Sequence, residues 1–375
     1  MPREKKKLLH IPQGTEGFYL EEAFVHRRLR ETLLDLFHLW GYLPVQTPVF
    51  DFFDTYRNLL DAEATEKIYR LIDREGDLLM LRSDNTLFMA KQMGLALTWE
   101  DLPVRVCYAD SILRHQDRED ISHNEFFQVG AELIGKDGLN GDLEVLMLMM
   151  ATIRHLRLPQ AVLHLGSHAF YTACFAAGRL SVADQQRVYT AIYNRAFPTA
   201  AEILKAAGYN GEEIRLMSRL FGFIGTIAEF SVLEKEAVGT KLLSSACREA
   251  LAYLAEVGAQ LKRLEVESRV RIDLSEIGGQ PYYTGLVFQV YMPGMDTAVA
   301  SGGRYNRLLG FFGFDAPSCG FSLLLRKVQE KIGSPERFKP EHGGVNIRKK
   351  DFVAAYREAE ELRAAGRIVT LQDLK

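Results

Sequence analysis

The feature that most constrains this chain is a set of short extended segments that pair off around turns. Residues 67–72 and 78–82 flank a turn at 74–77, and residues 104–112 and 125–133 flank a charged loop. Extended segments joined by such connections form hairpins, and successive hairpins build an antiparallel sheet. The sequence therefore predicts an α+β fold with an antiparallel sheet at its centre.

Helical periodicity surrounds these strands. Apolar residues recur at helical spacing in 21–40 and again in 142–155. From 168 to about 266 the pattern is helical throughout, so we expect an inserted helical subdomain within a core that spans 1–330. Residues 331–375 predict a linker that contains Pro and Gly, followed by a short strand–helix tail.

Composition places the chain among globular proteins and limits its partners. Of its 375 residues 47% are hydrophobic and 25% are charged, and the net charge is −3. A negative balance argues against a broad nucleic-acid surface, and the apolar runs are too short to span a membrane. The four cysteines lack any Cys-x-x-Cys spacing, so we expect no disulfide framework, no zinc site and a cytoplasmic location.

Two pairs of polar residues indicate that the sheet buries a polar ligand. Gln128 and Glu132 are four residues apart on one expected strand, so their side chains share a face. A carboxamide and a carboxylate are unusual on a buried face unless they bind something polar. Asp84 and Thr86 follow another strand, where a carboxylate and a hydroxyl suit an ammonium group. The same string is also typical of a helix N-cap.

Several segments of the chain resemble one known family. The string YYTG at 282–285, with GGRY at 302–305, resembles the signature of histidyl-tRNA synthetases. Residues 40–50, 108–135 and 320–327 resemble motifs 1, 2 and 3 of the class II synthetase superfamily. The resemblance implies a class II synthetase-like antiparallel sheet flanked by helices and a dimer formed through the motif 1-like segment. It also implies a tail similar to a truncated anticodon-binding domain.

The residues that would carry the synthetase reaction differ from the family pattern. Where that family has the arginine of Leu-Val-Arg-Gly-Leu-Asp, this chain has Gly278. The other departures at ATP-handling positions are Gln116, Asp117, Ser122, Asn124 and Lys327. Forming an aminoacyl adenylate needs cationic groups at the developing phosphate charge. The chain therefore resembles a synthetase that keeps its amino-acid site and has lost its catalyst.

This combination resembles the regulatory subunits of ATP phosphoribosyltransferase, a family that is itself similar to histidyl-tRNA synthetases. The resemblance implies a non-catalytic subunit that works with the short-form catalytic subunit in the first step of histidine biosynthesis. It also implies that L-histidine, the end product, binds for feedback regulation. It implies no cofactor, no metal, no tRNA partner and no membrane partner.

The resemblance also assigns roles to the candidate site residues. At the α-amino group of histidine it implies Asp84, Thr86 and Gln128, and at the imidazole it implies Glu132, Tyr282 and Tyr283. We expect Arg114 to hold the carboxylate, which is our own inference because Gly278 cannot do so. Ser83 and Arg304 are expected as supporting residues.

Two alternative functions remain open on the sequence. One is a divergent histidyl-tRNA synthetase that still works, and the other is a paralogue that activates an amino acid for a different acceptor. Both require ATP, so ATP–pyrophosphate exchange distinguishes them from a regulatory subunit.

Overall fold

The computed structural model describes residues 14–15, 17–60, 62–115, 124–176, 178–333, 338–339, 344–348 and 351–371. They fall into two compact units. The larger unit holds the described part of Met1–Gly17 with Leu29–Ile332, and the smaller one holds Phe18–Arg28 with the described part of Gly333–Lys375. Every residue of the candidate site lies in the larger unit.

A central sheet organises the larger unit, and within the described residues it has nine strands. Neighbouring strands are antiparallel except for the parallel pairs β1–β5 and β7–β9. The predicted α+β fold with a mainly antiparallel sheet is confirmed. In sheet order the strands are β1 (Leu43–Pro44), β5 (Val104–Leu113), β6 (Glu125–Ile134), β12 (Ser318–Leu324), β11 (Ala300–Arg304), β10 (Leu286–Tyr291), β7 (Val162–Ser167), β9 (Val270–Asp273) and β8 (Ile224–Gly225).

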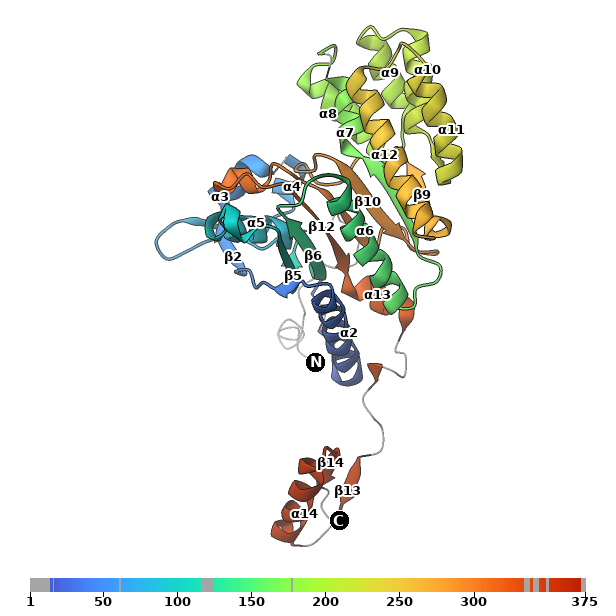
Figure 1. The fold of residues 1–375 in the computed structure, drawn as a ribbon. Helices are drawn as coiled ribbons and strands as arrows, with labels where there is room; N and C mark the ends of the chain where they lie inside the picture. Colours follow the sequence, from blue (N-terminus) through green and yellow to red (C-terminus); the bar gives the residue numbers. More distant parts are fainter. Residues whose placement is uncertain are drawn as a thin grey trace, which may run out of the picture. The chain divides into compact units, whose positions relative to one another are not determined.

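Helices cover both faces of this sheet (Figure 1). On one face lie α6 (Gly138–His155), α13 (Leu325–Ile332) and the carboxyl-terminal half of α2 (Leu20–Leu39), whose Phe37 ring meets that of Phe321 edge-on. The other face packs against α5 (Asn85–Ala96) and η4 (Leu309–Phe312) in one apolar cluster.

A second, three-stranded sheet precedes α5 along the chain. Its strands, in sheet order, are β2 (Phe50–Phe52), β4 (Leu78–Leu81) and β3 (Arg70–Ile72). Three short helices lie between β2 and β3, namely α3 (Phe53–Tyr56), η1 (Arg57–Leu59) and α4 (Ala62–Glu66), and η2 (Trp99–Asp101) lies between α5 and β5. Strand β4 leads directly into Asp84, the N-cap of α5, and so delivers one part of the candidate site.

A helical insertion lies between β7 and β9 and extends away from the sheet (Figure 1). Its helices are α7 (His168–Phe175), α8 (Val182–Tyr193), α9 (Phe197–Ala206), α10 (Gly211–Phe221), α11 (Ile227–Val238) and α12 (Ser245–Arg263), and η3 (Glu267–Arg269) leads into β9. Side-chain caps start most of them, as at Ser181 for α8 and Asn210 for α10. These local signals explain why the segment folds as a run of separate short helices.

The smaller unit contains a strand–helix–strand. Strands β13 (Val345–Ile347) and β14 (Val369–Leu371) are parallel, and α14 (Phe352–Ala364) packs on them through a small core of Ile347, Ala355, Ala359 and Val369. No helix in the described part of the chain is both long and apolar enough to span a membrane.

Candidate functional site

Strand register creates a floor of small residues on the α5 side of the central sheet. Directly paired residues on neighbouring strands point to the same face. One such row runs from Glu132 on β6 through Gly320 on β12 and Gly303 on β11 to Val287 on β10 and Gly166 on β7. Three of these positions are glycine, so side chains and loops can lie directly against the backbone there.

Gly320 shows how tight this floor is. A Cβ atom at Gly320 would lie 1.6 Å from Oε2 of Glu132 and 2.5 Å from the carbonyl oxygen of Ala131. Only glycine leaves room for the Glu132 side chain to lie flat across the neighbouring strand.

Glu132 is the centre of the site, and three hydroxyl groups bind it. The side chain is 1% exposed. Thr86 Oγ1 donates a hydrogen bond to Oε1 at 2.8 Å, and the Tyr108 hydroxyl donates to the same oxygen at 3.0 Å. The Tyr305 hydroxyl donates to Oε2 at 2.5 Å. The three donors come from α5, β5 and the residue after β11, so the carboxyl joins three separate parts of the fold.

This environment brings the titration of Glu132 close to neutral pH. Burial raises its pKa to about 7, even though the hydrogen bonds from Tyr305, Thr86 and Tyr108 favour the carboxylate. The charge of Asp84 adds to the increase. No cationic side chain among the described residues bonds to this carboxyl.

A second polar group lies beside Glu132, at the start of α5. Asp84 Oδ1 accepts from the backbone N–H of Leu87 at 3.1 Å, and Oδ2 is 3.5 Å from Arg114. Asn85 Nδ2 donates to Gln128 Oε1 at 3.2 Å. The structure thus brings Asp84, Thr86, Arg114, Gln128 and Glu132 together. Asp84 is both the N-cap of α5 and a member of this group.

Two atoms of this group lack hydrogen bonds. Asn85 is fully buried, and its Oδ1 has no hydrogen-bond partner in the described structure. Gln128 uses its Oε1 for Asn85, and its Nε2 donates to no described residue. A buried acceptor and a donor without partners are unusual in a pure packing region.

The two tyrosines stand between this group and the helical insertion. Tyr283 is buried and Tyr282 is half-buried, with ring centroids 5.2 Å apart, and the ring of Tyr282 meets that of Tyr305 edge-on at 5.8 Å. Burial, followed by the charge of Asp84, raises the pKa of both phenols. Neither hydroxyl is hydrogen-bonded to a described residue.

The structure places the two supporting residues differently. Ser83 belongs to the site through its backbone, because its carbonyl oxygen accepts from Arg114 Nε at 2.6 Å. Arg304 has different contacts. It is next to Gly303 on β11, so its side chain points to the opposite face, where Nε donates to Asp142 of α6 at 2.8 Å. The Arg304 side chain therefore contacts Asp142 and not Glu132 or Asp84, and any support of the ligand site by Arg304 would be indirect.

Sequence reasoning missed three residues of the site, namely Tyr108, Tyr305 and Asn85. A signal existed for the tyrosines. Tyr305 has the same strand parity as Gly303, and Tyr108 pairs with Gly130, where a Cβ would lie 2.5 Å from the Tyr108 ring. A large polar ring opposite a glycine therefore marks the site. Asn85 is recognisable only from the structure, through its bonds and its partnerless oxygen.

The departures from the synthetase pattern are only partly within the described residues. Gln116, Asp117 and Ser122 lie outside them, whereas Asn124 donates its backbone N–H to Gly14 O at 2.9 Å. Gly278 has φ +87, and a Cβ there would be 2.7 Å from the Tyr283 ring. A side chain at 278 would therefore be strained and would collide with Tyr283.

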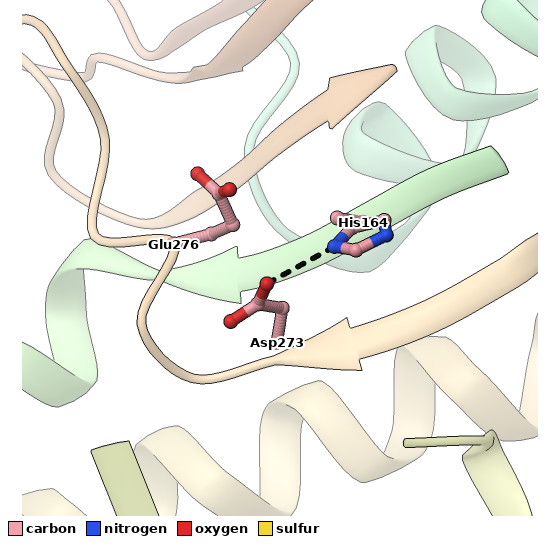
Figure 2. A group of neighbouring side chains, drawn as sticks. All are labelled: His164, Asp273 and Glu276. Atoms are coloured by element: carbon pink, nitrogen blue, oxygen red, sulfur yellow. Dashed lines mark hydrogen bonds and ion pairs between the residues drawn. The ribbon is translucent and has the colours of Figure 1, made fainter. Parts of the chain in front are cut away.

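A further polar cluster lies on the same sheet face beyond the glycine floor. Figure 2 shows His164 on β7, Asp273 at the end of β9 and Glu276 on the loop that follows. These three residues could in principle hold a metal ion. Arg195 already supplies a positive charge there, because its guanidinium lies 2.7 Å from Asp273 Oδ2 and 3.4 Å from Glu276 Oε1. We therefore interpret the cluster as an ionic clamp.

The pKa of Asp273 supports a structural role for the clamp, whereas burial raises the pKa of Glu276. Burial alone would raise the pKa of Asp273, but hydrogen bonds from His164, Ser275 and Arg195, with the charge of Arg195, hold it below its ordinary value. Asp273 is therefore a fixed anion that is fully engaged by its neighbours.

The fold and site can be compared with known proteins. A family model described as Histidyl-tRNA synthetase matches residues 14–328. A curated relative from Moorella thermoacetica, an ATP phosphoribosyltransferase regulatory subunit, is 30% identical over 365 residues, which cover 97% of this chain and 92% of that protein. The chain belongs to the histidyl-tRNA synthetase-like family of ATP phosphoribosyltransferase regulatory subunits.

Another relative agrees with this membership, and two solved structures agree with the fold. A regulatory subunit from Geobacter sulfurreducens is 30% identical over 363 residues, covering 95% of this chain and 81% of that protein. The crystal structure of an ATP phosphoribosyltransferase regulatory subunit/histidyl-tRNA synthetase from Bacillus halodurans has a TM-score of 0.84 at 24% identity, covering 98% and 93% of the two chains. A histidyl-tRNA synthetase from Nostoc sp. has a TM-score of 0.78 at 20% identity, covering 98% and 86%. These structures share the fold of the regulatory-subunit family.

Proposed function

We propose that this regulatory subunit is non-catalytic and completes ATP phosphoribosyltransferase, the first enzyme of histidine biosynthesis, by joining a short-form catalytic subunit in the cytoplasm. Relatives that match nearly its whole length carry the regulatory-subunit name, which supports the role of a regulatory subunit. Its own ligand is L-histidine, bound at the Glu132 site as the feedback signal.

The observation that carries the histidine proposal is the state of Glu132. A buried carboxyl with a pKa of about 7 matches the ordinary pKa of an imidazole, about 6.5. Thr86, Tyr108 and Tyr305 already fix the carboxyl in place, and an imidazole N–H can donate to its remaining lone pair. A preorganised acceptor of this kind favours histidine over amino acids with apolar side chains.

The neighbouring group suits the amino-acid end of the ligand. Asp84 supplies a negative charge for the α-ammonium, and its contact with Arg114 is long at 3.5 Å, so both groups can turn toward a ligand. Arg114 then pairs with the α-carboxylate. Tyr282 and Tyr283 supply hydroxyls that bond to no other residue in the described part of the chain.

We further propose that two copies of the chain pair through the motif 1-like segment. Strand β1 is at the edge of the central sheet. Apolar side chains are exposed in β1 itself, at Leu43 (59%), and after it, at Val49 (54%) and Phe50 (55%). Edges and patches of this kind are typical of association surfaces. Phe50→Asp should convert the dimer to a monomer in light scattering, and an unchanged mass would contradict this surface.

Reconstitution tests the function. Adding the purified chain to a short-form catalytic subunit should raise phosphoribosyl transfer to ATP, and L-histidine should lower it again. Glu132→Gln should still activate the partner but lose the response to histidine. Histidine-dependent ATP–pyrophosphate exchange above background by the chain alone would instead support a working synthetase and overturn the regulatory proposal.

A further inference from the structure

A single loop connects the ionic clamp to the ligand site. Residues 273–279 leave β9 and lead toward Tyr282 and Tyr283; we call this segment the strap. The strap crosses the glycine floor closely, because a Cβ at Gly166 would lie 1.9 Å from the carbonyl oxygen of Glu276. Figure 2 shows Glu276 on this loop above β7.

The helical insertion holds the strap at three points. His168, the first residue of α7, donates its Nδ1–H to the carbonyl oxygen of Ile277 at 2.8 Å. The Tyr189 hydroxyl of α8 donates a short hydrogen bond to the carbonyl oxygen of Gly278. Arg195, in the connection after α8, binds Asp273 and Glu276 through the clamp.

Tyr283 in turn is wedged between the strap and the sheet. A Cβ at Gly278 would lie 2.7 Å from Cδ2 of the ring, and a Cβ at Gly303 would lie 2.8 Å from Cε1. The ring therefore fits between two glycine backbones, one on the strap and one on β11. A movement of Gly278 toward the sheet would press on this ring, because Gly303 lies close against its other edge.

The groups that raise the pKa of Tyr283 agree with this position between the strap and the ligand site. After burial, the groups that raise its pKa are Asp84 and Glu132 on the ligand side, followed by Tyr189 and Tyr193 on α8. Tyr283 thus lies near α8 on one side and near Asp84 and Glu132 on the other.

We propose that Tyr189 and Arg195 of the helical insertion are positioning residues for the histidine site, which act by holding the strap and thereby the ring of Tyr283. The inference rests on the proposed histidine site and deepens it. It makes the insertion part of the binding apparatus, so that occupancy of the site and the position of α8 depend on each other, as linkage requires.

Tyr189→Phe is the sharpest test, because it removes one hydroxyl and leaves the ring. Loss of one hydrogen bond of ordinary net strength should weaken L-histidine binding about two- to tenfold in calorimetry. The matched control is Tyr171→Phe, since the Tyr171 hydroxyl also donates to a backbone carbonyl, that of Gln185 at 2.9 Å, within the same insertion. The control should bind histidine as the parent protein does.

Hydrogen exchange of the full chain supplies a readout that does not need the ligand. In Tyr189→Phe, peptides that cover 274–283 should exchange about threefold faster or more without histidine, and the Tyr171→Phe protein should not show this change. If the parent protein bound no histidine, the proposed function would fail, while this exchange difference would still decide whether Tyr189 holds the strap.

The coupling between histidine binding and α8 gives a second part of the experiment. Histidine should slow exchange in α8 of the parent protein and of Tyr171→Phe, and this protection should be lost in Tyr189→Phe. If Tyr189 had a merely structural role, Tyr189→Phe would lower the melting temperature, but histidine would still slow exchange in α8 as it does in the parent protein. Equal histidine affinity and equal strap exchange in Tyr189→Phe and its parent would overturn the proposal.

Discussion

Two buried carboxylates on one face of the same sheet have opposite partners. Among the described residues, Glu132 receives hydroxyl groups alone, from Thr86, Tyr108 and Tyr305, and its pKa is raised to about 7. Asp273 receives the guanidinium of Arg195, and its pKa is held below the ordinary value. Neutral donors orient a carboxyl without supplying charge, whereas a cation fixes it as an anion.

This difference in partners indicates which carboxyl is available to a ligand. Asp273 has its charge compensated inside the protein and gains nothing from a further partner. Glu132 retains an uncompensated desolvation cost, and a ligand that donates a proton or an N–H can relieve it. We therefore interpret the Asp273 cluster as the fixed frame and Glu132 as the responsive centre.

The largest effect is expected where the floor beneath Glu132 is filled. Gly320→Ala should lower the free energy of unfolding by more than about 3 kcal/mol, because its Cβ would displace Glu132 from its three hydrogen bonds. Chemical denaturation measures this. Gly211→Ala at the start of α10, where a Cβ meets nothing closer than 3.5 Å, is the control and should change stability little. A mild effect at 320 would mean that Glu132 is not confined as described.

The pH dependence of stability should separate the two carboxylates. The folded pKa of Glu132 is raised from 4.5 to about 7, so the folded state binds the extra proton between these values. Its contribution is fully present below pH 4.5 and is lost as pH rises through 7, a change of about 3 kcal/mol at most. Glu132→Gln should remove this part of the decline in urea titrations at several pH values. An identical pH profile in parent and variant would show that Glu132 titrates normally.

Removing the cation should damage the clamp. Arg195→Met should cost about 2 kcal/mol, because Asp273 and Glu276 lose their charged partner, with the loss moderated by the partial exposure of Arg195. The control is Arg219→Met, whose pair with Glu236 is exposed on both sides and should contribute less than about 1 kcal/mol. Thermal or denaturant unfolding compares them, and equal costs would remove the distinction between clamp and surface pair.

The smallest expected effect compares two helix caps. Asp84→Ala and Ser181→Ala each remove a side-chain cap, from α5 and α8, and each should cost about 1 kcal/mol. Only Asp84→Ala should also weaken histidine binding, since only Asp84 lies beside Glu132. Calorimetric titration of both variants checks this, and parallel losses of affinity would show that capping alone matters.

Much of this architecture was predictable because it depends on local patterns. Hairpins implied the antiparallel sheet, and the spacing of Gln128 and Glu132 implied a shared polar face, which the structure contains. The orientation of Arg304 was not foreseen, since the GGRY string does not reveal which of two successive residues faces α5. The clamp was also hidden, because His164, Arg195 and Asp273 are far apart in sequence and meet only through sheet order and the insertion.

The most direct test of the central claim is a calorimetric titration of L-histidine into the parent protein and into two variants, each changed at one buried carboxyl. Glu132→Gln removes the responsive carboxyl, and Asp142→Asn alters an equally buried one on the opposite face, bound to Arg304. The account predicts that the parent protein and Asp142→Asn bind histidine with similar affinity, while Glu132→Gln binds at least about tenfold more weakly. Undiminished binding by Glu132→Gln would contradict it.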